Sequence, residues 1–464
     1  MTLKTFTRHV HHHHHHLNHN HGNQIDMLHG SLLDKILLFA LPLAASMMLQ
    51  QLFNSADVAV VGRFDSPQAM AAVGSNGAAI NLFVNLFVGL SIGANVVVAK
   101  YIGKNESDNI NDAIHTSMSI ALISGALLLV GGIIAAKSLL TLMNTPDDII
   151  DLAVVYFRIY FLGMPFIMLY NFGSAVLRSK GDSKRPLWCL ALSGVINVIL
   201  NLIFVIVFKL SVIGVALATV ISNIVSALMI MYFLIKEEEP FKFRFRRLSL
   251  KKVYVSQILR VGLPAGIQGM LFSISNVTIQ TAINGLGSYA SAGSAAALNF
   301  DFLTYFVVAA FTQAVVTFTS QNYAARNYER CKKVYALTMI TGLFFTGLAC
   351  AICAIWKHEI LSLYTVNPEV LNYAEVRMIH AVAFLWMCNI YEIPGGALRG
   401  MGYSTLPAVI IMLGCCVLRI IWVYTVFGVY HNFAFLMDVY PVSWLVTGVV
   451  TLIAYYVVRK KLFA

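Results

Sequence analysis

Asp57 is an acidic residue near the end of a long apolar run that begins near Leu32. An ionised side chain at the centre of a membrane helix costs about 2.5–3.5 kcal/mol on insertion scales. Such a residue usually either lies at the membrane interface or is retained for a function. Held among polar groups, a carboxylate in this position can take up a proton on one side of the membrane and release it on the other. Asp57 lies toward the outer end of its run, so the sequence leaves two interpretations open, a proton carrier and a solvated interfacial acid.

Amide side chains in the apolar runs favour the functional interpretation of Asp57. Asn54 precedes Asp57 by three residues and so lies on nearly the same helical face. Asn197 and Asn201 are one helical turn apart in another apolar run, and buried amides need polar partners. Pro42 can kink the helix of Asp57 and free backbone groups. We therefore expect Asp57 to lie among polar side chains.

Charged residues also interrupt the apolar runs of the second half, at Asp301, Glu392 and Arg419. We hypothesise that Arg419 pairs with Glu392 or with Asp301, because a buried charge needs a partner. Such a pair is either a permanent salt bridge between helices or a site of coupling or substrate binding. Arg158 and Arg377 lie near the ends of their runs, so we expect their long side chains to reach the membrane surface.

The composition indicates a membrane protein with many spans. Of the 464 residues, 58% are hydrophobic and 11% are charged, whereas a soluble domain carries roughly 25% charged residues. The seven cysteines lie mostly in apolar segments, where they are expected to serve in packing. No GxxxxGK[ST], GxSxG or HExxH motif is present, so we expect no ATP-driven step, no enzymatic activity and no cofactor.

Apolar stretches long enough to cross a membrane recur along the whole chain. The expected fold is an all-α polytopic membrane protein with about twelve transmembrane helices. They are predicted at 33–61, 69–99, 112–136, 148–176, 186–208, 211–235, 257–285, 291–320, 332–356, 369–398, 405–430 and 433–458.

The chain repeats itself at an almost constant offset. Pro42, Tyr101 and Pro146 have counterparts of the same type 222 residues later, and LRSKGDSKRP from Leu177 corresponds to LRGMGYSTLP, 221 residues later. Each half therefore has six helices, and an even number gives both halves the same orientation in the membrane. Transporters built from such parallel repeats bind their substrate between the repeats. We expect two six-helix lobes around a central cleft.

Basic residues gather in alternate loops, and such loops stay in the cytoplasm. We therefore expect a multi-pass protein of the cell membrane with both termini cytoplasmic. This asymmetry explains the net charge of +11 without a nucleic-acid partner. The predicted parts are a His-rich disordered tail (1–31), an N-lobe (32–236), a basic cytoplasmic linker on the anionic inner leaflet (237–256) and a C-lobe (257–464). The tail is either an expression tag or native sequence.

Several segments resemble the multidrug and toxic compound extrusion (MATE) family, in its bacterial branch. They include FALPLAASMMLQQLFNSADVAVVGRF, AVGSNGAAINLFVNLFVGLSIGANVVVAKYIG, LRSKGDSKRP, NVILNLIFV, ALATVIS and LRGMGYSTLP. The resemblance covers the chain from about Leu32 to its end. It implies two lobes around a cleft that opens alternately to each side, and export of substrate against an inward flow of H⁺ or Na⁺.

The resemblance also implies a cation site. Asp57 matches the acid of the family's first helix, Asn197 the asparagine of its fifth and Thr219 a threonine of its sixth. Asn201 stands where relatives often have aspartate, which removes one carboxylate and favours H⁺ over Na⁺. The seventh helix, PAGIQGMLFSISNVTIQ, has no carboxylate, which argues against the mechanism of branches that place an acid there.

The expected function is cation-coupled efflux of small, hydrophobic and cationic molecules by a monomer in the lipid bilayer. The alternative is a flippase or exporter of a lipid-linked saccharide or another amphiphile. A flippase of that kind should line its cleft with several cations that hold phosphate. The charges within the apolar runs are instead mainly acidic, which favours a cationic or neutral substrate.

Overall fold

The structure is a computed structural model that describes residues 25–142, 145, 147–362 and 367–463. Within these residues the chain is helical and contains no β-strand. Most of the predicted His-rich tail lies outside the described residues, and so does Pro146, one of the repeat anchors.

The apolar runs of the first half form helices, and the fourth run is broken. The elements are α1 (Leu33–Phe64), α2 (Pro67–Gly103), α3 (Ser107–Leu142), α4 (Ile150–Leu162), α5 (Met164–Ser179), α6 (Lys184–Leu202), the π-helical turn η1 (Ile203–Val207) and α7 (Ser211–Lys236). α4 and α5 together make the fourth predicted span and are bent by 47° at the break between them.

The second half begins with a short 3₁₀ turn and long helices and ends with interrupted ones. The elements are η2 (Phe245–Arg247), α8 (Lys252–Gly285), α9 (Ser288–Ala324), α10 (Tyr328–Ile355), α11 (Lys357–Ser362), α12 (Pro368–His380), η3 (Val382–Cys388), α13 (Asn389–Gly400), α14 (Thr405–Ile411), η4 (Met412–Val417), α15 (Leu418–Trp422), η5 (Val423–Phe427), α16 (Gly428–Tyr430), α17 (Phe433–Met437) and α18 (Val439–Leu462). The turn η3 is 3₁₀-helical, whereas η4 and η5 are π-helical.

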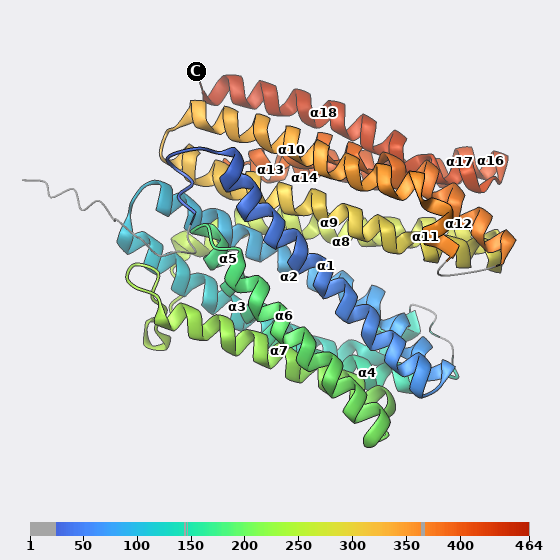
Figure 1. Cartoon of the computed structure of the whole chain (residues 1–464). Helices are drawn as coiled ribbons and strands as arrows, with labels where there is room; N and C mark the ends of the chain where they lie inside the picture. The colour runs from blue at the N-terminus through green and yellow to red at the C-terminus, as the bar shows by residue number, and fades with distance from the viewer. Residues whose placement is uncertain (1–24, 143–144, 146, 363–366, 464) are drawn as a thin grey trace, which may run out of the picture.

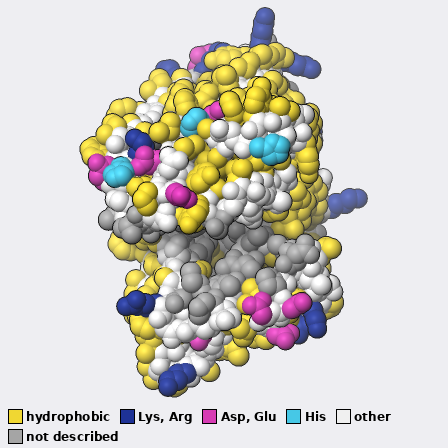
Figure 2. Space-filling model, turned by 90° about the vertical axis from the view of Figure 1, so that its right-hand side faces the viewer, with side chains coloured by type: hydrophobic (Ala, Val, Ile, Leu, Met, Phe, Trp, Pro, Cys, Tyr) yellow, Lys and Arg dark blue, Asp and Glu magenta, His cyan; other side chains and the backbone are white. Residues whose placement is uncertain are grey.

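The predicted all-helical membrane fold is confirmed. In the described residues 11 helices are long and apolar enough to cross a membrane, or up to 12 if the bent pair counts as one span. Several helices extend beyond the apolar runs, and the short helix α11 was not predicted. Figure 2 views the molecule from one end, where hydrophobic side chains cover much of its flanks and charged side chains are few.

The two halves form two groups of helices. In Figure 1 the helices α2–α7 lie below and α8–α18 lie above, while α1 runs obliquely between them. One hydrophobic core is built mainly from α2–α7. A second core joins Leu32, Ile36 and Phe39 at the start of α1 to α9, α10, α13 and α18. The first part of α1 therefore packs with the second half of the chain, and its last part packs with the first half.

The two groups touch most closely where α2 crosses α8. A Cβ atom on Gly89 would lie 2.2 Å from the backbone nitrogen of Gly266, and one on Gly93 would lie 2.9 Å from that of Gly262. The absence of side chains at these positions lets the two backbones come into contact. The sequence predicted close packing for the pair Gly89 and Gly93, and the structure confirms it.

Polar contacts join the two groups toward the end of the bundle that carries the C-terminus. The side chain of Gln321 donates to the carbonyl of Ser179 at 2.5 Å, and Ser320 donates to the carbonyl of Val96 at 2.8 Å. Thr317 donates to Asn95 Oδ1 at 3.0 Å. All three donors lie on α9, and their acceptors lie on α2 and α5.

The segment before α1 crosses the same end of the bundle. Its Met27 carbonyl accepts hydrogen bonds from Asn322 and Arg330, and Arg330 also donates to the carbonyls of His29 and Gly30. On the other side, the loop between α5 and α6 approaches Ile25, where a Cβ on Gly181 would lie 2.5 Å from the Ile25 carbonyl oxygen. We call residues 25–31 the N-terminal strap, because they contact both groups of helices.

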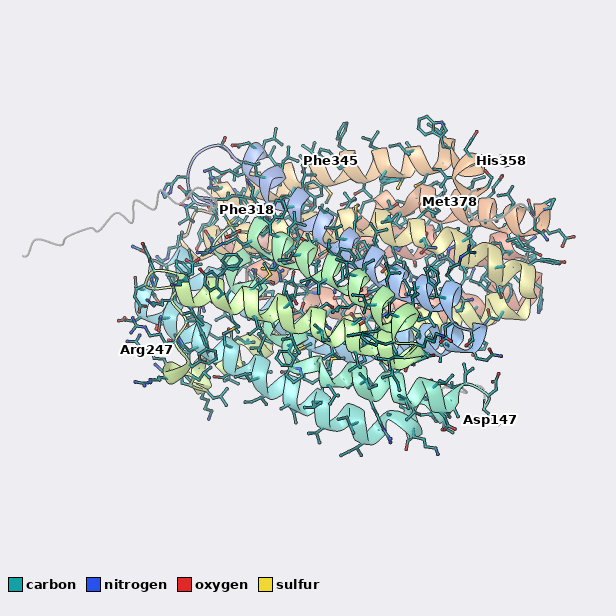
Figure 3. The ribbon with its side chains drawn as sticks, turned by 60° about the horizontal axis from the view of Figure 1, so that its bottom comes forward. Asp147, Arg247, Phe318, Phe345, His358 and Met378 are labelled. Carbon is teal, nitrogen blue, oxygen red and sulfur yellow. The ribbon has the colours of Figure 1, made fainter. Side chains whose placement is uncertain are left out.

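The linker between the halves folds against α3. Asn111 donates to Glu239 and to the carbonyls of Pro240 and Lys242, and Phe243 is buried. Arg247 of this linker lies at one end of the molecule, whereas Asp147 and His358 lie at the other (Figure 3). The linker therefore lies at the end that carries the C-terminus.

A buried ionic cluster closes this end of the first half. Glu237 bonds to Lys180 at 2.5 Å and to Arg185 at 2.6 Å, and Arg185 also pairs with Asp182. Burial alone would raise the pKa of Glu237, but the charges of Lys180 and Arg185 outweigh it and hold the pKa below its usual range. Glu237 is therefore ionised at neutral pH, and its stabilising effect is lost as the pH falls through its lowered pKa.

Replacing Gly89 by valine should separate α2 from α8. The added side chain overlaps the backbone of Gly266, and overpacking of this kind costs about 1–3 kcal/mol. We expect Gly89→Val to lower the melting temperature and the yield of monodisperse protein. The matched control is Gly131→Val, because a Cβ there meets no atom within 4 Å. Equal melting temperatures for the two variants would contradict the contact.

Candidate functional site

The predicted cation site of the first half is assembled in the structure. Asp57 comes from α1, Asn197 and Asn201 from α6, and Thr219 from α7. Asn201 Nδ2 donates to Asp57 Oδ1 at 2.5 Å, and the Thr219 hydroxyl donates to Asp57 Oδ2 at 3.1 Å. Asn201 Nδ2 lies 3.2 Å from Asn197 Oδ1, and Asn197 Nδ2 lies 3.4 Å from Thr219 Oγ1. The four side chains form one hydrogen-bonded cluster.

This cluster is buried and contains one charge. Asp57 is 5% exposed and Asn201 is 0% exposed, so Asp57 is not the solvated interfacial acid that was the other interpretation. Within the described residues Asp57 has no Lys or Arg partner, and its bonded neighbours are amides and a hydroxyl. A buried carboxylate without a counterion favours binding of a cation or a proton.

Backbone features of α1 and α6 let Asp57 reach its partners. A Cβ on Gly194 would lie 1.7 Å from the ring of Phe53, so glycine is required where α6 packs on α1. The π-helical turn η1 begins two residues after Asn201, and such turns occur frequently at functional sites. Asn54, expected on the same face as Asp57, is exposed and lies outside the cluster.

Two tyrosines that the sequence did not single out approach the cluster from α4. The phenols of Tyr156 and Tyr160 lie close enough to interact electrostatically with Asp57. They are four residues apart and therefore share one helical face. That spacing could have marked them, but one helix alone does not indicate which other helix it faces.

The cluster offers oxygen atoms for a cation in place of its internal hydrogen bonds. Asn201 Oδ1 is buried and has no partner within the described residues. Rotation of the Asn201 amide would present this oxygen together with the Asp57 carboxylate, which is the type of donor that hard cations prefer. A proton on Asp57 would instead require only a hydrogen-bond acceptor, and Asn197 Oδ1 and Asn201 Oδ1 are the nearest amide oxygens of the cluster.

The charges of the second half pair differently from the prediction. Asp301 on α9 binds Arg377 on α12, whose Nε lies 2.9 Å from Asp301 Oδ2 and whose Nη1 donates to Ser294 at 2.7 Å. Arg377 is 2% exposed, so the expectation that it extends to the membrane surface is wrong. Arg377 is held inside because α9 supplies both an acid and a hydroxyl at its level.

Glu392 also has a partner other than Arg419. Glu392 accepts a hydrogen bond from Tyr305 at 3.2 Å and lies 3.7 Å from Arg399. Arg399 in turn donates to Gln268 at 2.7 Å. Glu392 and Arg399 are seven residues apart on α13, which places them two turns apart on one face and within reach of each other.

Arg419 is therefore not paired as the sequence suggested. It lies on α15 with 3% exposure, and its Nε donates to Ser443 on α18 at 3.1 Å. The rings of Tyr440 and Phe272 lie 4.8 Å and 5.7 Å from its guanidinium carbon. The hypothesis of a pair with Glu392 or Asp301 is wrong for this conformation, because Arg399 and Arg377 already bind those acids.

A sequence model of the MatE family matches residues 42–203 and 264–425, which correspond to the two repeats. The probable multidrug resistance protein YoeA of Bacillus subtilis is 29% identical over 381 residues, or 80% of this chain and 82% of that protein. The probable multidrug resistance protein NorM of Thermotoga maritima is 25% identical over 385 residues, or 81% of this chain and 82% of that protein.

Among solved structures, the outward-facing conformation of a multidrug resistance MATE family transporter of the MOP superfamily is similar, with a TM-score of 0.87. The similarity covers 94% of this chain and 98% of that one, at 22% sequence identity. At this identity the match shows that the fold is shared.

Replacing Asn201 by aspartate should convert the cluster into a two-carboxylate site. The new acid would lie beside Asp57, and two adjacent carboxylates bind a metal cation more strongly than one. We expect Na⁺ to raise the melting temperature of Asn201→Asp relative to choline, and to have little effect on the wild type. Thermal unfolding in matched chloride salts measures the difference, with Asn201→Gln as the uncharged control. An equal response of all three proteins would contradict the geometry.

The pair of Asp301 and Arg377 is expected to stabilise the fold. Removing one partner of a buried ion pair costs about 3–5 kcal/mol, because the other charge stays buried. Asp301→Asn should therefore lower protein yield and melting temperature, while transport per folded molecule stays near the wild-type value. Asp147→Asn, at an exposed acid, is the matched control. Normal yield with lost transport would instead assign Asp301 a coupling or substrate role.

Proposed function

The chain belongs to the MatE family of multi-pass membrane transporters, and we propose that it exports small, hydrophobic and cationic molecules in exchange for H⁺. The observation that carries this proposal is the buried Asp57, whose carboxylate is bonded to α6 and α7 without a basic partner in the described residues. An ionisable group of this kind inside a membrane marks an ion pathway. The printed names of the relatives supply the substrate class, since they are multidrug resistance proteins.

H⁺ is the coupling ion that the cluster favours. The cluster has one carboxylate, and the residue that could supply a second is Asn201, whose amide donates to Asp57. Protonation of Asp57 removes its charge and changes which atoms donate and accept within the cluster. The contacts that join α1 to α6 and α7 then rearrange. A proton that moves down 100 mV supplies about 2.3 kcal/mol for this step.

Alternating access follows from where the two groups of helices meet. They are joined at α2 and α8 and by the α9 contacts near the C-terminal end of the molecule. The concentration of basic loops at this end supports a cytoplasmic location for both termini. The conformation is then closed toward the cytoplasm. Transport requires these contacts to break while the opposite ends approach each other.

The proposal is tested by efflux of ethidium from cells that express the chain. Ionophores collapse the H⁺ gradient and the Na⁺ gradient separately, and the same measurement is made on Asp57→Asn. We expect efflux by the wild type to stop when the H⁺ gradient collapses. Asp57→Asn should abolish efflux at normal expression, because an amide cannot carry the proton.

The matched control is Asp65→Asn, since Asp65 is an exposed acid at the end of the same helix. It should export ethidium at the wild-type rate. Efflux by Asp57→Asn equal to that of the wild type would refute the role of Asp57. Loss of efflux with the Na⁺ gradient alone would replace H⁺ by Na⁺ as the coupling ion.

A further inference from the structure

Arg419 is a buried cation that the proposed transport cycle does not use. It is 3% exposed, and Ser443 is its hydrogen-bond partner within the described residues. The acid near enough to interact with it electrostatically is Asp301, which is already bonded to Arg377 through two nitrogen atoms. Arg377 and Arg419 thus share one acid. The interior of the second half keeps one positive charge in excess, and a buried charge without a counterion is unfavourable.

The repeat places this cation opposite the cation site of the first half. Arg419 is the counterpart of Asn197, 222 residues later, and Ile279 is the counterpart of Asp57 at the same offset. In the first half Asn197 donates to Thr219, between α6 and α7. In the second half Arg419 donates to Ser443, between α15 and α18. The same place in the fold holds an acid in one half and a base in the other.

The backbone around Arg419 is irregular on both sides. The five-residue helix α15 lies between the π-helical turns η4 and η5. Such turns widen a helix locally and occur frequently at functional sites. This irregularity is independent of the charge of Arg419, and it gives the guanidinium a setting unlike that of a packed α-helix.

Aromatic rings separate Arg419 from the boundary between the two groups of helices. Phe272 lies on α8, which contacts α2, and its neighbour Ser273 accepts a hydrogen bond from Asn85 across that boundary. Phe272 and Tyr440 leave the guanidinium edge as the polar part of a surface otherwise formed by rings. A planar molecule could stack on these rings while an oxyanion reaches the guanidinium.

We propose that Arg419 binds an oxyanion, a carboxylate or a phosphate, carried by an amphiphile at the boundary between the halves. The group would neutralise the excess positive charge beside Asp301 and Arg377. A zwitterion would match both halves, with its cationic part toward Asp57 and its anionic part at Arg419. This proposal rests on the proposed function and narrows its substrate class from simple cations to molecules with an anionic group.

The probes are two dyes with the same xanthene ring system. Rhodamine 19 carries a free carboxylate, and rhodamine 6G is its ethyl ester. Their binding to the purified full-length chain in lipid nanodiscs is measured by fluorescence anisotropy. We expect the wild type to bind rhodamine 19 about tenfold more tightly than rhodamine 6G, which is the size of one charge-assisted hydrogen bond.

Variants then assign the preference to Arg419. Arg419→Gln should lose the preference for rhodamine 19, with little change for rhodamine 6G, and Arg419→Lys should keep part of it. The matched control is Arg158→Gln, at an exposed arginine, which should keep the full preference. If Arg419→Gln does not fold, benzoate provides the second measurement. Benzoate should displace rhodamine 19 from the wild type but not rhodamine 6G.

The outcomes separate this inference from the proposed function. If the wild type binds neither dye, the proposed function fails. If it binds both equally, or if Arg419→Gln keeps the preference, Arg419 only packs against its rings and the inference is overturned.

A lipid arm distinguishes the two sources of the oxyanion. Nanodiscs of phosphatidylcholine are compared with nanodiscs that contain phosphatidylglycerol. A preference that is equal in both assigns the site to the transported molecule. A preference that phosphatidylglycerol abolishes assigns the site to a lipid phosphate.

Discussion

The backbone contact between α2 and α8 is the constraint on which the arrangement of the two halves depends. At Gly89 and Gly266 the helices are too close for any side chain, so the halves meet there through main-chain atoms. Contacts of this kind gain their stability from van der Waals packing rather than from directional bonds. They can therefore hold two helix groups together while the angle between them changes. The directional hydrogen bonds between the halves lie toward one end, where Gln321 and Ser320 donate from α9.

Within that frame each half holds its own buried polar centre, and the two centres have opposite charge. In the first half an acid is surrounded by amides and a hydroxyl. In the second half three arginines share two acids. Duplication of one six-helix unit explains why Asn197 and Arg419 occupy equivalent places. Their difference makes the two halves chemically unequal, so a proton can act on one half while the other keeps a fixed charge.

Much of this fold follows from the sequence, because long apolar runs and an internal repeat are strong signals. The Asp57 cluster also followed, since Asn197 and Asn201 lie one turn apart and needed a partner. The pairing in the second half did not follow, because hydropathy does not give the depth of a residue in a broken helix. Arg377 precedes the 3₁₀ turn η3, and this interruption of the tenth span left its position inside the protein unpredictable. The phenols of Tyr156 and Tyr160 were missed because their partner lies on a different helix, ninety-nine or more residues earlier in the chain.

The N-terminal strap has a practical consequence for anyone who attaches a label to this protein. Residues 25–31 lie across the seam between the halves, held by Arg330 on one side and close to Gly181 on the other. A fluorescent protein fused ahead of Ile25 would therefore emerge at that seam, where it would hinder any separation of the halves. The C-terminal end of α18 lies at the outer edge of the molecule (Figure 1). A reporter placed there would leave the seam free, and purification handles are better placed at that end for functional work.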